Sequence, residues 1–138
     1  MSYFSSIGSH GSGPGQLQHP WDAAFDSANN VYVSDSENGR IQVFTEDGNF
    51  FFFFLTKGTD KGEIGNPTMI TINNENEIFF PDYGNHRVSV FTTQGDHLTS
   101  FGTYGSGPQQ FTNPYGIAVD QSGMVYVADN GNNHVQVF

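Results

Sequence analysis

The sequence predicts an all-β fold made of three copies of one unit of four short antiparallel strands. The first observation is an internal repeat, because side chains of the same kind recur every 47 residues (67 − 20 and 114 − 67) with no insertion. The recurring positions include Pro20, Pro67 and Pro114, then Asp35, Asp82 and Asp129, and Phe44, Phe91 and Phe138. The second observation is that Val, Ile, Phe and Tyr dominate four stretches per copy, with Gly-, Asn- and Asp-rich pairs between them. Such four-stranded repeats are typical of β-propeller blades.

Each copy supplies its four strands at matching positions, and no segment has a helical period. The first strands are expected at 21–26, 68–73 and 115–120, the second at 31–34, 78–81 and 125–128, the third at 40–44, 87–91 and 134–138, and the fourth at 3–8, 50–55 and 97–102. The three copies form one propeller unit, 1–138, with repeats at about 4–44, 51–91 and 98–138.

The third copy carries the most specific motif. It reads Pro-Tyr-Gly-Ile-Ala-Val-Asp at 114–120, Val-Tyr-Val-Ala-Asp at 125–129 and Asn-His-Val-Gln-Val-Phe at 133–138, and the second copy holds Asn-His-Arg-Val at 85–88. These segments resemble the NHL repeat, a family whose domains are typically six-bladed propellers, so the chain resembles half of one ring. The second copy departs from the pattern at Pro81, which has no N–H for the ladder and therefore predicts a bulge or a local strand ending.

Three blades are too few to close a ring, since closed propellers have about four to eight. The chain by itself would expose two blade faces and would leave its first outer strand, around residues 4–7, without a partner. Large exposed apolar faces mark interfaces. We therefore expect two copies to meet head to tail as a homodimer of six blades. A fragment of a longer six-bladed chain, or an engineered half, is compatible with the same pattern.

Charge narrows the range of partners. Arg40, Lys57, Lys61 and Arg87 are the only Lys or Arg residues, against 14 carboxylates, and the net charge is −10. Nucleic acids and anionic membranes bind cationic surfaces, so neither is an expected partner. No apolar run approaches the roughly 20 residues that span a bilayer, and the amino terminus does not resemble a secretion signal. The sequence leaves the compartment open, and the absence of a recognisable signal or spanning segment slightly favours the cytoplasm.

An acid and a base recur around the turn between the second and third strands. The members of each pair lie five positions apart in the sequence, and the pairs are Asp35 and Arg40, Asp82 and Arg87, and Asp129 and His134. A charge-assisted hydrogen bond would tie each turn, and we interpret the pairs as structural because every copy has one. A metal site is the alternative, but the run at 35–39 lacks calcium-loop spacing and the histidines share no position between copies. We assign no metal, no cofactor and no catalytic residue.

Positions that differ between copies are candidates for specificity. His19 precedes the recurring proline of the first copy, Trp21 and Tyr115 follow that proline in the first and third copies, and Tyr83 lies in a second-to-third strand turn. The blade topology places all four on one face near the axis. Aromatic side chains at a propeller mouth suit a peptide or a small polar ligand. Packing of Trp21 and Tyr115 between blades is the alternative interpretation.

The expected function is that of a non-enzymatic binding or scaffold module. It would close its ring by self-association and present the loop face to a protein or peptide. The resemblance implies such a role, because NHL domains often recognise substrates within larger proteins, including tripartite-motif ubiquitin ligases. Two alternatives stay open: a metal-dependent lyase or hydrolase with a site in the central channel, as in the similar amidating lyases, and an RNA-binding domain.

Overall fold

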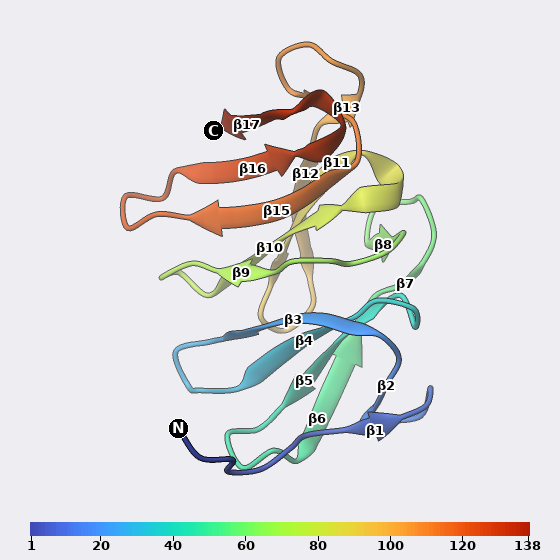
Figure 1. The fold of residues 1–138 in the computed structure, drawn as a ribbon, viewed down its shortest axis with the longest axis vertical. Coiled ribbons are helices and arrows are strands. Elements are labelled where there is room, and N and C mark those ends of the chain that lie inside the picture. The colour runs from blue at the N-terminus through green and yellow to red at the C-terminus, as the bar shows by residue number, and fades with distance from the viewer.

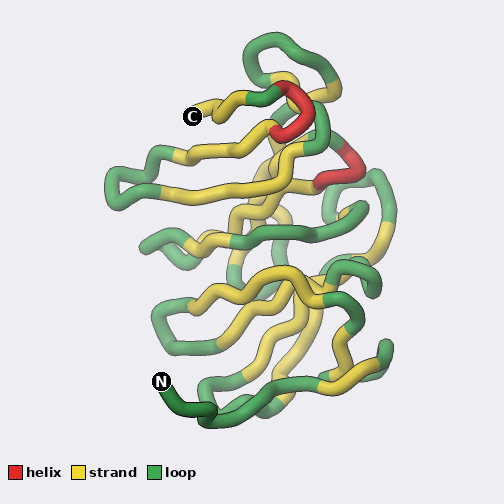
Figure 2. The backbone as a smooth tube through the Cα atoms, in the orientation of Figure 1, coloured by secondary structure: helices red, strands yellow, loops and turns green.

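The computed structural model describes all residues from Met1 to Phe138 and arranges them as three twisted antiparallel sheets stacked along one axis (Figures 1 and 2). The first sheet consists of β3 (Pro20–Phe25), β4 (Val31–Asp35), β5 (Arg40–Phe44) and β6 (Phe50–Phe54). The second consists of β9 (Thr71–Ile72), β10 (Glu77–Asp82), β11 (Arg87–Thr92) and β12 (His97–Phe101), and the third of β15 (Pro114–Val119), β16 (Val125–Asp129) and β17 (His134–Val137). In each sheet the strands are neighbours in chain order, which confirms the all-β blade topology.

Ten of the twelve predicted strands occur within one residue of their expected ends. The exception in the second blade is β9, which spans only Thr71–Ile72 instead of 68–73. The polar groups before it bond to other blades rather than to the ladder: the Thr68 hydroxyl donates to the Tyr115 carbonyl at 2.9 Å, and the Ile70 N–H donates to the Asp22 carboxylate at 3.0 Å. The innermost strand of this blade is therefore short because it ties its neighbours together.

The strand ending predicted at Pro81 is wrong. Strand β10 continues through Pro81 to Asp82, and Pro81 pairs with Val88 of β11 without a register shift. The interruption lies instead in the ladder between β9 and β10, which stops at Phe79 and leaves one further bridge, from Pro67 to Asp82. Proline has no N–H to donate, so a break in pairing next to it costs the sheet little.

The outer strand predicted at 3–8 does not form, so the third blade has three strands within this chain rather than four. Residues 1–8 are exposed and have no strand partner. An isolated strand cannot satisfy its N–H and C=O groups by itself, and β17, the only third strand without an outer neighbour, lies at the opposite end of the molecule (Figure 1).

The connections between blades contain a small element that the repeat alone did not predict. Each glycine-rich connection folds back as a two-residue parallel pair, formed by β1 (Ser9–His10) with β2 (Gln16–Leu17), β7 (Thr56–Lys57) with β8 (Glu63–Ile64), and β13 (Thr103–Tyr104) with β14 (Gln110–Phe111). Two short helices, η1 (Tyr83–Asn85) and η2 (Asn130–Asn132), form turns at the same end of the second and third blades. No helix of the chain has the length or apolar character required to cross a membrane.

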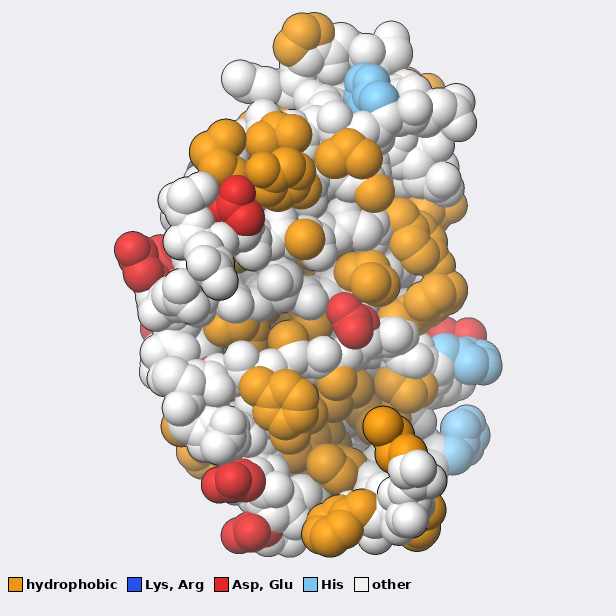
Figure 3. Space-filling view, turned by 60° about the vertical axis from the view of Figure 1, so that its left-hand side comes forward, with side chains coloured by type: hydrophobic (Ala, Val, Ile, Leu, Met, Phe, Trp, Pro, Cys, Tyr) orange, Lys and Arg blue, Asp and Glu red, His pale blue; other side chains and the backbone are white.

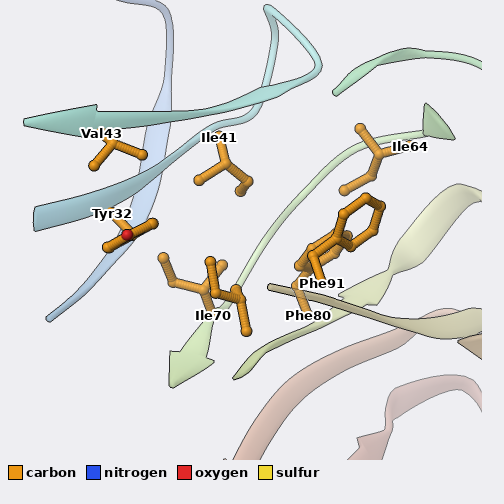
Figure 4. Packing of buried hydrophobic residues seen from close by; sticks show 8 residues of the cluster. Tyr32, Ile41, Val43, Ile64, Ile70, Phe80 and Phe91 are labelled. Carbon is orange, nitrogen blue, oxygen red and sulfur yellow. The ribbon is translucent and has the colours of Figure 1, made fainter. Parts of the chain in front are cut away.

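The core lies between the blades. Tyr32, Ile41 and Val43 of the first blade face Phe80 and Phe91 of the second in one buried cluster (Figure 4). A second cluster joins Phe79 and Val88 of the second blade to Val127 of the third. Both faces of the middle blade are thus covered, which explains why its inner strands are apolar on both sides.

The outward face of the third blade is the exposed counterpart of these interfaces. Tyr126, Val135 and Val137 are 38%, 59% and 49% exposed, whereas the residues two repeats (94 positions) earlier, Tyr32, Ile41 and Val43, are at most 2% exposed. Figure 3 shows apolar side chains towards both ends of the molecule, with acidic groups among them and no Lys or Arg in view. An apolar blade face of this kind is a feature of an interface.

Candidate ligand-binding site at the loop face

The candidate site begins with an irregularity at the start of each innermost strand. In β3, Pro20 pairs with Asp35 but Ala23 pairs with Val33, so two residues oppose one. In β15 the register shifts in the same way between Pro114 and Gly116. Bulges change the direction in which a side chain points and are common beside functional sites. They release Trp21 and Tyr115, which follow the two prolines, from the regular alternation of the strand.

The released side chains meet each other across the blades. The Trp21 and Tyr115 ring centroids are 5.3 Å apart and the Tyr83 and Tyr115 centroids 5.8 Å apart, both with nearly perpendicular planes. Edge-to-face packing of this kind is favourable for aromatic rings. Three of the four residues predicted for ligand binding therefore form one cluster, the aromatic triad Trp21, Tyr83 and Tyr115, with one member from each blade. Trp21 nevertheless stays 52% exposed.

His19 lies beside the triad rather than in it. Its Nδ1 contacts the Glu37 carboxylate at the surface, and both residues line a 430 Å³ pocket together with Trp21 and Asn66. An exposed pair contributes little to stability. The pocket instead offers a carboxylate and an imidazole next to an exposed indole.

A second pocket, of 710 Å³, lies next to Tyr115 of the triad. Its lining includes Tyr115, Met69, Asn130, His134 and Val135. Of these residues only Tyr115 was predicted to bind a ligand. Val135 was missed because its equivalents one and two repeats earlier, Val88 and Ile41, are core residues, and His134 was assigned to the turn instead.

The pairs predicted to tie the turns are in contact in all three blades. Arg40 Nε donates to Asp35 at 2.8 Å, Arg87 Nε donates to Asp82 at 3.1 Å, and His134 Nε2 lies 3.1 Å from Asp129. All three carboxylates are fully buried.

All three buried aspartates share two further kinds of partner in addition to the base. One is a backbone N–H of the preceding blade connection, from Gln18, Gly65 or Thr112, at 2.7–2.8 Å. The other is the side-chain amide of Asn38, Asn85 or Asn132. Each of these amides donates also to a glycine carbonyl in the connection. The 47-residue step of the asparagines was visible in the sequence, but their partners were not. The network fixes the connections, and with them the loop face.

The network lowers the pKa of Asp129. Burial acts to raise it, but hydrogen bonds from the Asn132 amide, the Thr112 N–H, Gln136 and His134 outweigh burial and hold the pKa below its usual value. A carboxylate with a depressed folded-state pKa stabilises the fold at neutral pH, and that stabilisation is lost as the pH falls through the unfolded value of about 3.9 and below.

Asp129→Asn is accordingly expected to be less stable than the wild type at pH 7, with a deficit that shrinks as the pH falls from about 5 to 3. Urea unfolding at a series of pH values measures this deficit. The matched control is Asp47→Asn, because Asp47 is an exposed turn residue. A deficit that stays constant with pH would mean that the charge of Asp129 does not stabilise the fold.

No group of three or more His, Cys, Asp or Glu side chains is arranged to hold a metal ion. Three of the five histidines contact three different residues: His19 contacts Glu37, His134 contacts Asp129, and His97 contacts Ser100.

The sequence matches known proteins in two segments. Residues 17–44 and 111–138 match the family described as NHL repeat. The chain is 44% identical over 45 residues to "Protein lin-41" of Caenorhabditis elegans and, over the same length, to "E3 ubiquitin-protein ligase TRIM71" of Rattus norvegicus. These alignments cover 33% of this chain but only 4% and 5% of the two relatives.

The fold is similar to solved β-propellers. Virginiamycin B lyase from Staphylococcus aureus superimposes with a TM-score of 0.63 over 86% of this chain and 40% of the lyase chain, at 17% sequence identity. At this identity the likeness concerns the fold alone. The three sheets are therefore propeller blades, in a chain that spans less than half of that structure and a small part of its sequence relatives.

Proposed function

We propose, from the match of residues 17–44 and 111–138 to the NHL repeat, that this chain is an NHL-repeat binding module whose loop face captures a protein or peptide. Two copies would complete a six-bladed ring and so enlarge that face. No chemical step is required of this chain in such a role.

The aromatic triad is the observation that carries this proposal. Tyr and Trp are enriched among the residues that dominate binding energy, because their rings offer a large rigid contact area together with a polar group. Trp21 is the single tryptophan of the chain and remains half exposed, although it is held by Tyr115. The two pockets, one lined by Trp21 and the other by Tyr115, would accept the side chains that flank a bound residue.

Charge favours a cationic partner. The net charge of −10 would steer a basic protein or peptide towards the chain. Glu37 is exposed and is the carboxylate that lines the His19 pocket together with Trp21. A lysine or arginine side chain could pair with Glu37 and lie against the exposed indole by a cation–π contact.

The exposed blade face supports ring closure. Tyr126, Val135 and Val137 are apolar at positions where the other two blades bury their side chains against a neighbour. A second copy related by a two-fold axis would cover both open ends of the half-ring at once. It would also bring a second aromatic triad to the same mouth.

The test is a peptide selection followed by titration. Peptides from a displayed random library are selected on the wild-type chain, and binding is measured through the emission of Trp21 and by calorimetry. Trp21→Ala and Tyr115→Ala are each expected to weaken binding about tenfold or more. Phe25→Ala is the control, because Phe25 is a 60% exposed aromatic residue at the other end of the same strand. Equal affinities for all three variants would place the binding site elsewhere.

A further inference from the structure

We propose that residues 3–7 of one copy form the missing outer strand of the third blade in a second copy, where they pair antiparallel with β17. This inference rests on the proposed ring closure and names the contact that would hold the ring together. It is supported by the position of the segment, the free edge of β17, the chemistry of the paired side chains and the location of the two termini.

The amino-terminal segment already follows the path of an outer strand. A methyl group built at Gly48 would lie 3.3 Å from Ile7, and one built at Gly95 would lie 2.8 Å from Phe54. The two pairs are equivalent, because Gly95 and Phe54 lie one 47-residue repeat after Gly48 and Ile7. Ile7 therefore packs against the first blade as the end of β6 packs against the second. In Figure 1 the segment runs along the outside of the first blade, where the outer strand of a preceding blade would lie.

Strand β17 offers the edge that such a segment requires. Strands β5 and β11, its equivalents, each pair with an outer strand, whereas β17 pairs only with β16. A free strand edge carries unpaired N–H and C=O groups that favour the addition of another strand. Carrying the register of the other two blades over by the repeat pairs Val135 with Ile7, Gln136 with Ser6 and Val137 with Ser5.

The chemistry of the paired side chains is consistent with this register. At the next pair, Phe138 would meet Tyr3, where Phe44 packs edge-on against Phe50 and Phe91 packs edge-on against His97. Phe4 would take the bulge position, which in the other outer strands is held by the exposed residues Phe51 and Leu98. Ile7 would replace Phe54 and Phe101, which both pack against core clusters.

A second copy is the occupant that this 138-residue chain can supply. The segment cannot reach β17 of its own chain, because the two lie at opposite ends of the long axis (Figure 1). An additional repeat in a longer chain would use the same edge, so the experiment uses the 138-residue chain alone. Completed in this way, each ring would present two aromatic triads around one mouth.

A cysteine pair tests the register directly, since the chain has no cysteine of its own. The equivalent residues Ser89 and Ser100 have their hydroxyl oxygens 3.2 Å apart, so cysteines at Ser6 and Gln136 of two copies would lie within reach of a disulfide. The Ser6→Cys/Gln136→Cys variant is oxidised mildly and run on a non-reducing gel. Most of the protein is expected as a covalent dimer that dithiothreitol reverses.

Three controls define the result. Ser89→Cys/Ser100→Cys should form a disulfide within one chain and stay at monomer mass. Ser6→Cys alone and Gln136→Cys alone should remain largely uncrosslinked, but should form a covalent dimer when they are mixed. Ser2→Cys/Gln136→Cys is out of register and should crosslink poorly.

Light scattering on the wild-type chain separates the possible failures. A mass near twice 15.2 kDa with no crosslink in the Ser6→Cys/Gln136→Cys variant would overturn strand donation and leave the proposed ring in place. Equal crosslinking of the in-register and out-of-register pairs would also overturn it. A monomer at all concentrations would overturn the ring and the strand donation together, while the peptide-binding test would still decide the role of the aromatic triad.

Discussion

Asp35→Ala is expected to lower the free energy of unfolding by about 3–5 kcal/mol, the range for removing one partner of a buried ion pair. The Asp35 carboxylate is fully buried and accepts hydrogen bonds from the Gln18 N–H at 2.7 Å and from Arg40 Nε at 2.8 Å. Without it, the almost completely buried Arg40 side chain would have no anion. An unpaired buried charge costs far more than an exposed ion pair contributes.

Urea unfolding at one fixed protein concentration measures the change, because self-association would make stability depend on concentration. Asp35→Asn keeps a hydrogen-bond acceptor and is expected to lose less. Asp47→Ala removes an exposed carboxylate and should change stability by about 0.5 kcal/mol or less. A loss below about 1 kcal/mol for Asp35→Ala would show that the turn does not depend on this carboxylate.

Phe80→Ala is expected to cost about 3–5 kcal/mol, the range for removing a large aromatic side chain from a core. Phe80 has no exposed surface and stacks on Phe91 with ring centroids 5.3 Å apart. Figure 4 shows the two rings side by side, facing the side chains of the first blade. The cavity would open between two blades, so the variant should lose packing between the sheets as well as within one sheet.

Thermal and urea unfolding of Phe80→Ala and Phe51→Ala provide the matched comparison. Phe51 is the bulged residue of β6 and is 56% exposed, so its truncation should cost less than about 1 kcal/mol. Similar losses of unfolding free energy for the two variants would contradict the assignment of the core to the space between the blades. Partial unfolding of Phe80→Ala in two transitions would indicate that the first blade separates from the other two.

Most of the fold was predictable because the same local sequence pattern occurs in each of the three copies. Each copy has turn residues at fixed offsets and β-branched or aromatic residues between them. These signals act between residues that are close in the sequence, so they fix where each strand begins and ends. The two exceptions are strands whose pairing depends on distant groups. Strand β9 is short because Thr68 and Ile70 bond to other blades, and residues 3–8 have no partner edge within reach.

The candidate site was predictable only in part. The predicted contacts of Asp35, Asp82 and Asp129 with Arg40, Arg87 and His134 are local, since they lie within one turn. Ligand binding by His19, Trp21, Tyr83 and Tyr115 stays a prediction that the peptide experiment tests. The sequence suggested that these four residues share a face. It did not indicate that His19 contacts Glu37 while the rings of the other three residues pack against one another.

The sequence by itself determined the number of blades, the order of their strands and the residues that tie each turn, because all of these follow from spacing within a single 47-residue repeat. Only the tertiary structure decided that Trp21, Tyr83 and Tyr115 meet, and that the outward face of the third blade exposes the residues its neighbours bury. Contacts between blades depend on the angle at which whole sheets pack, and that angle results from side chains far apart in the chain.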